Sequence, residues 1–385
     1  MRGVTSDSSE FGNRCWNFGK LANESTQLEF GGHKIQDSRE WSSTGRGMKT
    51  SHCTCGNRLF FENTLCIRCG SETGLCPECY FVSPLIPVGE GVYRCGHPDC
   101  GARVQKCRNF TVEHICNGLS PLPDGEANEW TLCPECRLTQ VIPDLSVPGN
   151  REKWRQIEIA KRRVLYTVHA LGLPVGRPGN TVQPKLIFHF KADEVTPVYT
   201  GHANGIITIN INEADDVERE RNRVAFGEPH RTLVGHFRHE LGHYYWDMLV
   251  RGRCEGAFRD LFGDERNPSY EDAKVRYYMF GPPVDWQGRF ISAYAAMHAW
   301  EDFAETFGAY LDMVAILDTA SSLPGEQLRN IDCVKMLSAY QQVGILVNEL
   351  NREMGIQDLV PEVFHGDVID KLTFVHRLIA KSSLV

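Results

Sequence analysis

The distribution of cysteine constrains this chain more than any other feature of its sequence. Twelve of its 15 cysteines lie between Cys53 and Cys136. The segment around them is rich in glycine and proline and has only short apolar runs, so it needs cross-links to hold a fold. The N-terminus lacks the apolar core of a signal peptide, which predicts a chain that is not secreted. In such a chain, clustered cysteine pairs indicate metal binding more than disulfides.

The twelve cysteines fall into three consecutive sets of four, and each set can supply the four tetrahedral ligands of a structural Zn²⁺. The sets are Cys53, Cys55, Cys66 and Cys69; Cys76, Cys79, Cys95 and Cys100; and Cys107, Cys116, Cys133 and Cys136. Three points stay open. His52 could act in the first set, since it stands at the usual two-residue gap from Cys55, and His97 could replace Cys95 or Cys100. Cross-brace pairing would use the same cysteines in another grouping.

Composition divides the chain into three regions. Residues 1–50 are rich in Ser, Gly, Asn and Thr without sustained periodicity, which predicts a flexible tail. Residues 51–145 are predicted to form the zinc-ribbon module, and the stretch IPDLSVPGN (142–150) a linker. Residues 146–385 are predicted to be one α+β domain, rich in helix and with a small sheet.

Hydrophobic periodicity predicts the elements of this last domain. One helix is predicted to begin with Asn150 as its cap and to end before Gly172. The other predicted helices cover 213–223, 231–250, 292–317, 328–353 and 367–381, and the predicted strands cover 185–190 and 205–211. The second strand is interpreted as an edge strand near a cleft, with core packing as the alternative.

The stretch 231–249 contains the pentapeptide HELGH at residues 239–243. On a helix, His239 and His243 share a face, so both imidazoles can bind one Zn²⁺. Glu240 can reach the open coordination position and act there as general base toward a water molecule. Apolar residues recur at helical spacing through this stretch, which favours a core helix. A helix whose two histidines and glutamate bind no metal is the alternative interpretation.

A third ligand must come from elsewhere in the chain. The extended HExxHxxGxxH pattern is excluded, because Trp246 stands in place of the glycine and Leu249 in place of the third histidine. An acidic ligand is therefore expected, and the candidates are Glu255, Asp264, Glu265, Asp285, Glu301, Asp302 and Glu305. Glu301 is preferred as ligand, with Glu305 orienting a ligand histidine, because two carboxylates one turn apart on an apolar helix are costly to bury without a partner. A solvated acidic face is the alternative.

Three further residues are predicted to lie near the metal. His236 shares a face with the two histidine ligands, but three ligands from one straight helix converge poorly on one ion. It is therefore interpreted as a supporting or substrate-facing residue. Tyr294 and His298 are predicted catalytic residues, since either could donate a hydrogen bond to a tetrahedral oxyanion. Ordinary packing is the alternative for both.

Charge and hydropathy exclude several classes of protein. The net charge is −8, and residues 51–145 carry seven Lys and Arg against eleven Asp and Glu. A nucleic-acid-binding module is expected to be basic, so the zinc ribbons are predicted to have a structural or protein-binding role. No run approaches about 20 apolar residues, which predicts that no helix spans a membrane. The expected location is the cytoplasm or the nucleus.

Several sequence blocks resemble those of the zinc-binding metallopeptidases that carry N-terminal zinc ribbons. The blocks are LFFEN with the following CxxCG, CRLTQVIPDLS, TGHANGIITININEADD, EPHRTLVGHFRHELGHYYW, FRDLFGDE, GPPVDW, SAYAAMHAWEDFAETF and LNREMG. The resemblance covers most of 51–385 and implies a gluzincin-like peptidase fold, with residues 146–385 as a zincin-like metallopeptidase domain. By position it assigns His239, Glu240, His243 and Glu301 to the site. The middle cysteine set is richer than expected for the shorter bacterial members.

The sequence therefore predicts a zinc peptidase with one catalytic and about three structural Zn²⁺, acting on a peptide or protein substrate. The alternative is a binding protein with a degenerate peptidase fold, in which zinc modules dock a protein or nucleic acid and the HExxH metal is structural. Glu240 favours the enzyme, because a purely structural site does not need a base.

Overall fold

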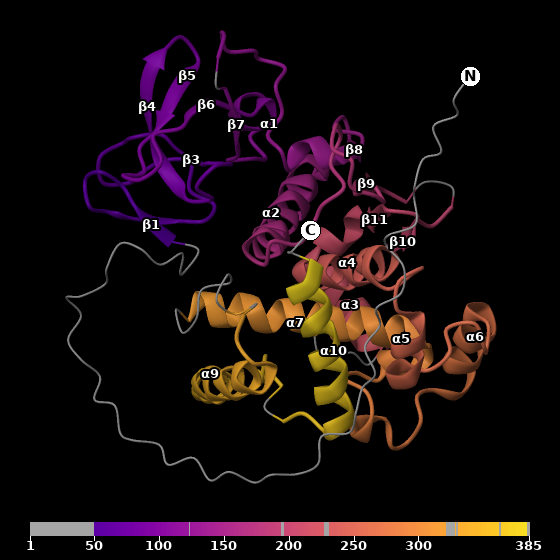
Figure 1. Cartoon of the computed structure of the whole chain (residues 1–385). Coiled ribbons are helices and arrows are strands. Elements are labelled where there is room, and N and C mark those ends of the chain that lie inside the picture. Colours follow the sequence, from indigo (N-terminus) through magenta and orange to yellow (C-terminus); the bar gives the residue numbers. More distant parts are fainter. Residues whose placement is uncertain are drawn as a thin grey trace, which may run out of the picture.

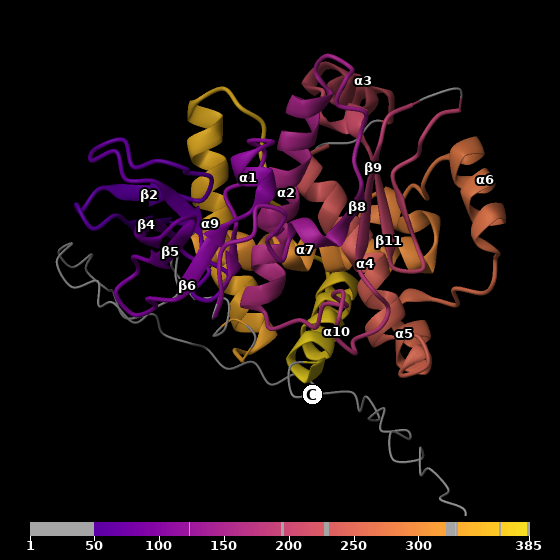
Figure 2. The same cartoon turned by 90° about the horizontal axis from the view of Figure 1, so that it is seen from above.

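The computed structural model describes residues 50–122, 124–193, 196–226, 231–320, 328, 330–361 and 363–382. Except for Thr50, the predicted tail lies outside these residues, as do residues 227–230. Figures 1 and 2 show a cysteine-rich module beside a larger domain of helices around a small sheet. The predicted α+β class, with a cysteine-rich region preceding a helix-rich domain, is confirmed.

The cysteine-rich module is built from short antiparallel strands. Strands β1 (Thr50–His52) and β2 (Arg58–Phe60) form a pair. A five-stranded sheet has the order β3-β4-β5-β6-β7. Its strands are β3 (Thr73–Leu75), β4 (Val82–Gly89), β5 (Val92–Cys95), β6 (Arg103–Lys106) and β7 (Leu119–Pro121), and the short helix α1 (Arg108–Thr111) follows β6. Strands this short bury little apolar surface, as expected for a segment that depends on cross-links.

The C-terminal domain contains a four-stranded sheet in the order β10-β11-β9-β8. Strands β8 (Thr139–Val141), β9 (Ile187–Lys191) and β11 (Ile206–Asn210) are parallel, and β10 (Gly201–Ala203) is antiparallel to β11. The strand β8 lies before the predicted domain boundary at 145, so this sheet spans it.

The prediction that 205–211 is an edge strand is wrong, because β10 covers that side of β11. The chain reverses between the two strands through Asn204 and Gly205, whose φ angles are 52° and 85°. A Cβ at Gly205 would also lie 2.2 Å from the carbonyl oxygen of Lys185. This tight turn places 201–203 at the edge of the sheet.

Helices form the rest of the C-terminal domain. They are α2 (Asn150–Ala170), α3 (Asp216–Phe226), α4 (Leu233–Leu249), α5 (Glu255–Phe262), α6 (Tyr270–Phe280), α7 (Ala299–Thr319), α9 (Cys333–Glu353) and α10 (Gly366–Ser382), with 3₁₀ turns η1 (Cys136–Leu138), η2 (Ile211–Ala214), η3 (Trp286–Gly288) and η4 (Tyr294–Met297). One large core joins α2, α4, α7 and α10 to the sheet. No helix among the described residues is both long and apolar enough to cross a bilayer.

Two details of the predicted helices are wrong. Gly149, with φ of 88°, is the N-cap of α2, and the side chain of Asn150 instead donates to the carbonyl oxygen of Asp144. The helix predicted over 292–317 is interrupted at His298, whose extended backbone separates η4 from α7. Helices α5 and α6 were not predicted, because they are short and α6 has almost no buried face.

Candidate metal centre

Close packing of α4 against α7 positions the candidate ligands. His239 and His243 lie one turn apart on α4, and Gly242 stands between them in the sequence. A Cβ at Gly242 would lie 2.6 Å from the Cα atom of Ala304 on α7. Glycine therefore allows the two helix backbones to come close, so that Glu301 in the first turn of α7 meets both histidines.

Three ligand atoms converge on one point. The Nε2 atoms of His239 and His243 lie 3.2 Å apart, and they lie 3.1 and 3.4 Å from Oε2 of Glu301. Tetrahedral Zn²⁺ with bonds of about 2.0–2.1 Å separates its ligands by about 3.3 Å, so the geometry fits this ion. Oε2 of Glu301 is buried and has no hydrogen-bond partner among the described residues. Burial would raise the pKa of Glu301, but the two imidazoles hold it well below its usual range.

Glu305 orients one of the two histidines. Its Oε1 lies 2.6 Å from Nδ1 of His239, and its Oε2 accepts a hydrogen bond of 2.6 Å from the hydroxyl of Ser292. With a proton on Nδ1, the Nε2 lone pair of His239 points toward Glu301 and His243. A carboxylate behind a ligand histidine is the usual support in zinc sites.

Glu240 lies next to these ligands and is buried. Its side chain is 5% exposed, and Oε2 has no hydrogen-bond partner among the described residues. Burial raises the pKa of Glu240, although both histidines act in the opposite direction. A buried carboxylate with a free oxygen and a raised pKa is suited to accept a proton near neutral pH.

Asp285 is exposed, and the other acidic candidates have other partners. Asp264 binds Arg266, Glu265 binds Arg259, and Glu255 binds the backbone NH of Gly252. Asp302 points to the other side of α7, where its Oδ2 lies 2.7 Å from Nζ of the buried Lys371. Of the seven candidates, the structure brings only Glu301 into a cluster with both histidines among the described residues.

His298 caps a helix. Its Nδ1 accepts the backbone NH of Trp300 at the start of α7, at 3.2 Å. This hydrogen bond gives His298 a structural role as the N-cap of α7. Its predicted catalytic role stays a prediction. Tyr294 on η4 lies nearer the ligands, with its ring centroid 6.0 Å from that of His239. Burial raises the pKa of Tyr294, so its hydroxyl stays protonated and able to donate.

His236 faces away from the convergence point. Its Nε2 lies 3.2 Å from Oε2 of Glu213, whose other oxygen binds Arg231 at 2.6 Å. Burial would raise the pKa of Glu213, but His236 and Arg231 lower it to about 2. This group holds the start of α4 to η2, so the interpretation of His236 as a supporting residue fits its position.

Sequence reasoning missed three aromatic neighbours of the ligands. The hydroxyl of Tyr270 donates to Oε1 of Glu301 at 2.8 Å. The ring of Trp300 lies on that of His243, with centroids 3.7 Å apart, and His202 of β10 stacks 6.3 Å from His243 on centroids. The motif SYED (269–272), whose serine caps α6, could have predicted a helix start. No local signal shows that Tyr270 meets a residue 31 positions away.

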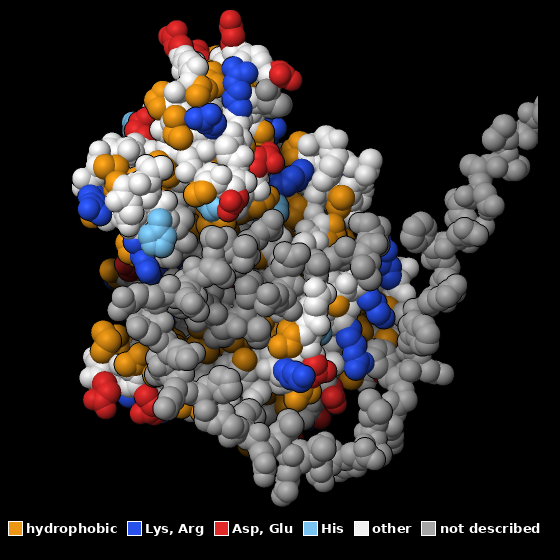
Figure 3. Space-filling view, turned by 60° about the vertical axis from the view of Figure 1, so that its left-hand side comes forward, with side chains coloured by type: hydrophobic (Ala, Val, Ile, Leu, Met, Phe, Trp, Pro, Cys, Tyr) orange, Lys and Arg blue, Asp and Glu red, His pale blue; other side chains and the backbone are white. Residues whose placement is uncertain are grey.

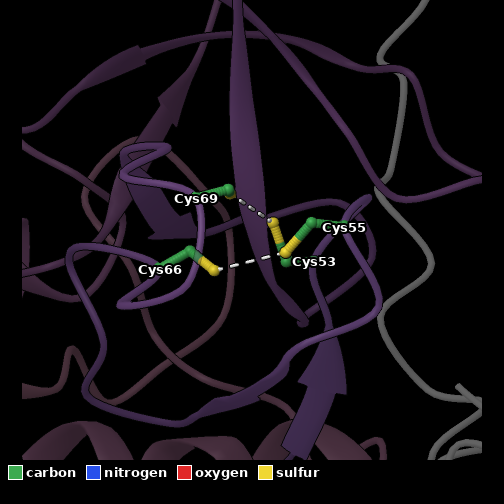
Figure 4. A group of neighbouring side chains, drawn as sticks. All are labelled: Cys53, Cys55, Cys66 and Cys69. Atoms are coloured by element: carbon green, nitrogen blue, oxygen red, sulfur yellow. Dashed lines mark hydrogen bonds between the residues drawn. The ribbon is translucent and has the colours of Figure 1, made fainter.

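The cysteines cluster in the predicted consecutive sets, not in cross-brace pairs. In the first set (Figure 4), the sulfurs of Cys53 and Cys69 lie 3.6 Å apart and those of Cys55 and Cys66 lie 3.7 Å apart. Tetrahedral Zn²⁺ with Zn–S bonds of about 2.3 Å separates its sulfurs by about 3.8 Å, so the set fits this ion.

The two histidines left open lie outside these clusters. His52 is exposed on β1, and His97 stacks on Phe81 with its Nδ1 accepting the NH of Asp99. On the face of the module shown in Figure 3, lysine and arginine side chains alternate with acidic and apolar ones and form no basic patch. This face does not favour nucleic-acid binding.

Comparison with known proteins finds two family models. The model described as "Putative zinc-binding metallo-peptidase" matches residues 150–378, and a zinc-ribbon domain model matches residues 50–147. Uncharacterized proteins of Mycobacterium bovis and of two strains of Mycobacterium tuberculosis are 36% identical over 344 residues, which cover 86% of this chain and 95% of each relative. No solved structure matches significantly.

Proposed function

This chain belongs to the "Putative zinc-binding metallo-peptidase" family, as the resemblance predicted, and we propose that it is a zinc-dependent peptidase that hydrolyses peptide bonds. His239, His243 and Glu301 hold the catalytic Zn²⁺, and Glu240 is the general base. One observation carries the proposal: three ligand atoms converge beside a buried carboxylate that has an oxygen free. Three protein ligands also leave one position open, as catalytic rather than structural zinc sites do.

Each residue has a separate task in this reaction. A Zn²⁺ ion held by His239, His243 and Glu301 would polarise a carbonyl group and lower the pKa of a bound water. Glu240 accepts the proton from the attacking water and passes it to the nitrogen of the leaving amine. Glu305 keeps the proton of His239 on Nδ1, and Glu301 brings a negative charge that two imidazoles alone would not supply.

We also propose that the folded chain binds four zinc ions. Each of the three cysteine sets holds one structural ion, and the histidine–glutamate set holds the fourth. Elemental analysis of the purified protein should give four zinc ions per chain. A value of two or fewer in folded protein would contradict the grouping.

The change Glu240→Gln tests the peptidase. It keeps the size of the side chain and removes its ability to act as a base, and Glu240 is not a ligand in this proposal. The variant should fold, keep four zinc ions and lose hydrolysis by about 10² or more. A peptide library is the right substrate, because a single peptide does not sample the specificity of an unknown peptidase.

A matched control is Glu353→Gln, which makes the same change on an exposed residue at the end of α9. It should cleave the library like the wild type. A library that the wild type leaves intact would favour a binding protein with a structural metal. Equal cleavage by wild type and Glu240→Gln would show that Glu240 is not the base.

A further inference from the structure

Residues 263–292 leave the body of the C-terminal domain after α5 and return at η4, and they carry α6 between them. Little packing holds α6, because Ala273 is its only buried residue. Its apolar side chains Val275, Tyr278 and Met279 are 58%, 60% and 67% exposed. Figures 1 and 2 show α6 at the margin of the domain. A helix with so few buried contacts is expected to open easily by itself.

Both ends of this segment are nevertheless bonded to carboxylates of the candidate zinc site. Near the first end, Tyr270 donates to Oε1 of Glu301, whose Oε2 faces the histidines. At the second end, Ser292 donates to Oε2 of Glu305, whose Oε1 faces Nδ1 of His239. Each carboxylate therefore has one oxygen on the metal side and the other on segment 263–292.

Two further contacts hold the segment near its second end. Nζ of Lys371 on α10 donates to the carbonyl oxygen of Arg289 at 2.7 Å and pairs with Asp302 on α7. The ring of Tyr277 packs edge-on against Tyr294, with centroids 5.8 Å apart. The segment is thus joined to α7, α10 and η4 by a few polar and aromatic contacts rather than by a hydrophobic face.

We propose that segment 263–292 is a positioning element for zinc, in which Tyr270 fixes the ligand Glu301 and Ser292 fixes Glu305 behind His239. This inference rests on the proposed metal site. A carboxylate held by a second hydrogen bond loses less rotational freedom when it binds the ion. The seating of α6 and the affinity for zinc are then coupled, and each must affect the other equally.

The first test measures zinc affinity in variants of the full chain. Tyr270→Phe removes only the hydroxyl and should weaken zinc binding at this site by about 10–100-fold, the usual range for such supporting groups. Ser292→Ala should weaken it less, because it acts through one more residue. Competition with a zinc chelator gives the affinity, and cadmium-113 NMR separates the ion bound by nitrogen and oxygen from those bound by sulfur.

The matched control is Tyr278→Phe, the same change on the exposed side of the same helix. It should leave zinc affinity unchanged. A second control uses Glu305→Ala as background. There Ser292→Ala should add nothing, whereas a merely structural role for Ser292 would keep its full effect and overturn the proposal for this end.

The second test is hydrogen exchange of α6. Filling the histidine–glutamate site in the wild type should slow exchange of the α6 amides, and Tyr270→Phe should reduce that slowing. Exchange that does not depend on the ion would overturn the coupling. If the wild type binds only the three sulfur-bound ions, the proposed site and this inference both fail. If it binds the fourth ion and both variants keep wild-type affinity, only this inference fails.

Discussion

The cysteine-rich module and the C-terminal domain hold their folds by different means. Around the first two cysteine sets, the buried apolar residues form two small clusters, and each contains cysteines of one set. The C-terminal domain instead has one large core that runs through the sheet and through α2, α4, α5, α7, α9 and α10. On the proposed zinc sites, we therefore expect the module to need its ions in order to fold and the domain to need its ion only for chemistry.

The third cysteine set belongs to both regions. Its four cysteines are at most 4% exposed and lie in the large core, together with α2 of the C-terminal domain. Arg162 of α2 is also buried and donates to the carbonyl oxygen of Ile115, next to Cys116. Four thiolates around Zn²⁺ carry a net charge of −2, and Arg162 places a positive charge beside them. This set is where losing a structural ion should disturb the domain that carries the catalytic residues.

The largest expected effect comes from Cys133→Ser. Cys133 is fully buried in the third set, so loss of this ligand should lower the free energy of unfolding by more than about 4 kcal/mol, with exchange protection lost in α2 as well. Cys69→Ser is the control, since Cys69 is exposed in the first set and its loss should affect only the module. Thermal denaturation measures the loss of stability in each variant, and hydrogen exchange measures the loss of protection in α2. Equal effects on α2 would contradict the distinction between the sets.

Arg162→Met should have the next largest effect. The change leaves the negative charge proposed for the third set without the cation beside it, while Glu158 keeps the buried Lys161 as partner at 2.8 Å. The unpaired charge should cost about 3 kcal/mol. Arg163→Met is the control on the neighbouring residue. Arg163 pairs with Glu62 at the surface, with 40% of its side chain exposed, so its loss should cost about 1 kcal/mol or less. Denaturant unfolding of the zinc-loaded proteins measures the two losses of unfolding free energy. Similar losses in both variants would show that Arg162 does not compensate the charge of the third cysteine set.

Glu301→Gln tests the other side of the comparison. It should lower zinc affinity at the histidine–glutamate site by about 10² or more, above the range of supporting groups. The helices and the three cysteine-bound ions should remain, because the core does not depend on this ion. Asp264→Asn is the control and should leave the metal content unchanged, since Asp264 binds Arg266 at the surface. Loss of the metal in Asp264→Asn alone would make Asp264 the third ligand.

The smallest expected effect is the pH dependence that Glu213 contributes. Its pKa is lowered from 4.5 to about 2 in the folded chain, so the folded state binds this proton more weakly than the unfolded state. The stabilisation is therefore present above pH 4.5 and is lost as pH falls toward 2. Glu213→Gln should cost about 1–2 kcal/mol at pH 7 and progressively less below pH 4. A difference in stability that is constant from pH 2 to 7 would contradict the role of its charge.

Features that depend on neighbours in the sequence were predicted well. The ligand helix, both strands and the grouping of cysteines follow from periodicity or from short spacings, which act over a few residues. Features that depend on a reversal of the chain, or on a contact between residues far apart in the sequence, were not predicted. The strand β10 exists because Asn204 and Gly205 make a tight turn, and the extended backbone of His298 separates η4 from α7 where the apolar pattern predicts one continuous helix.

The sequence by itself determined which chemistry each part of the chain can perform. Thiolates in groups of four predict structural zinc sites, and HELGH presents two imidazoles and a carboxylate from one helix because residues four apart share a face. Only the tertiary structure decided which of seven acidic residues joins the two histidines. It also decided that Tyr270 bonds to Glu301 and that Ser292 bonds to Glu305. The physical reason is that these contacts depend on how closely α4 approaches α7, and packing at Gly242 and Ala304 sets that distance across some 60 residues of sequence.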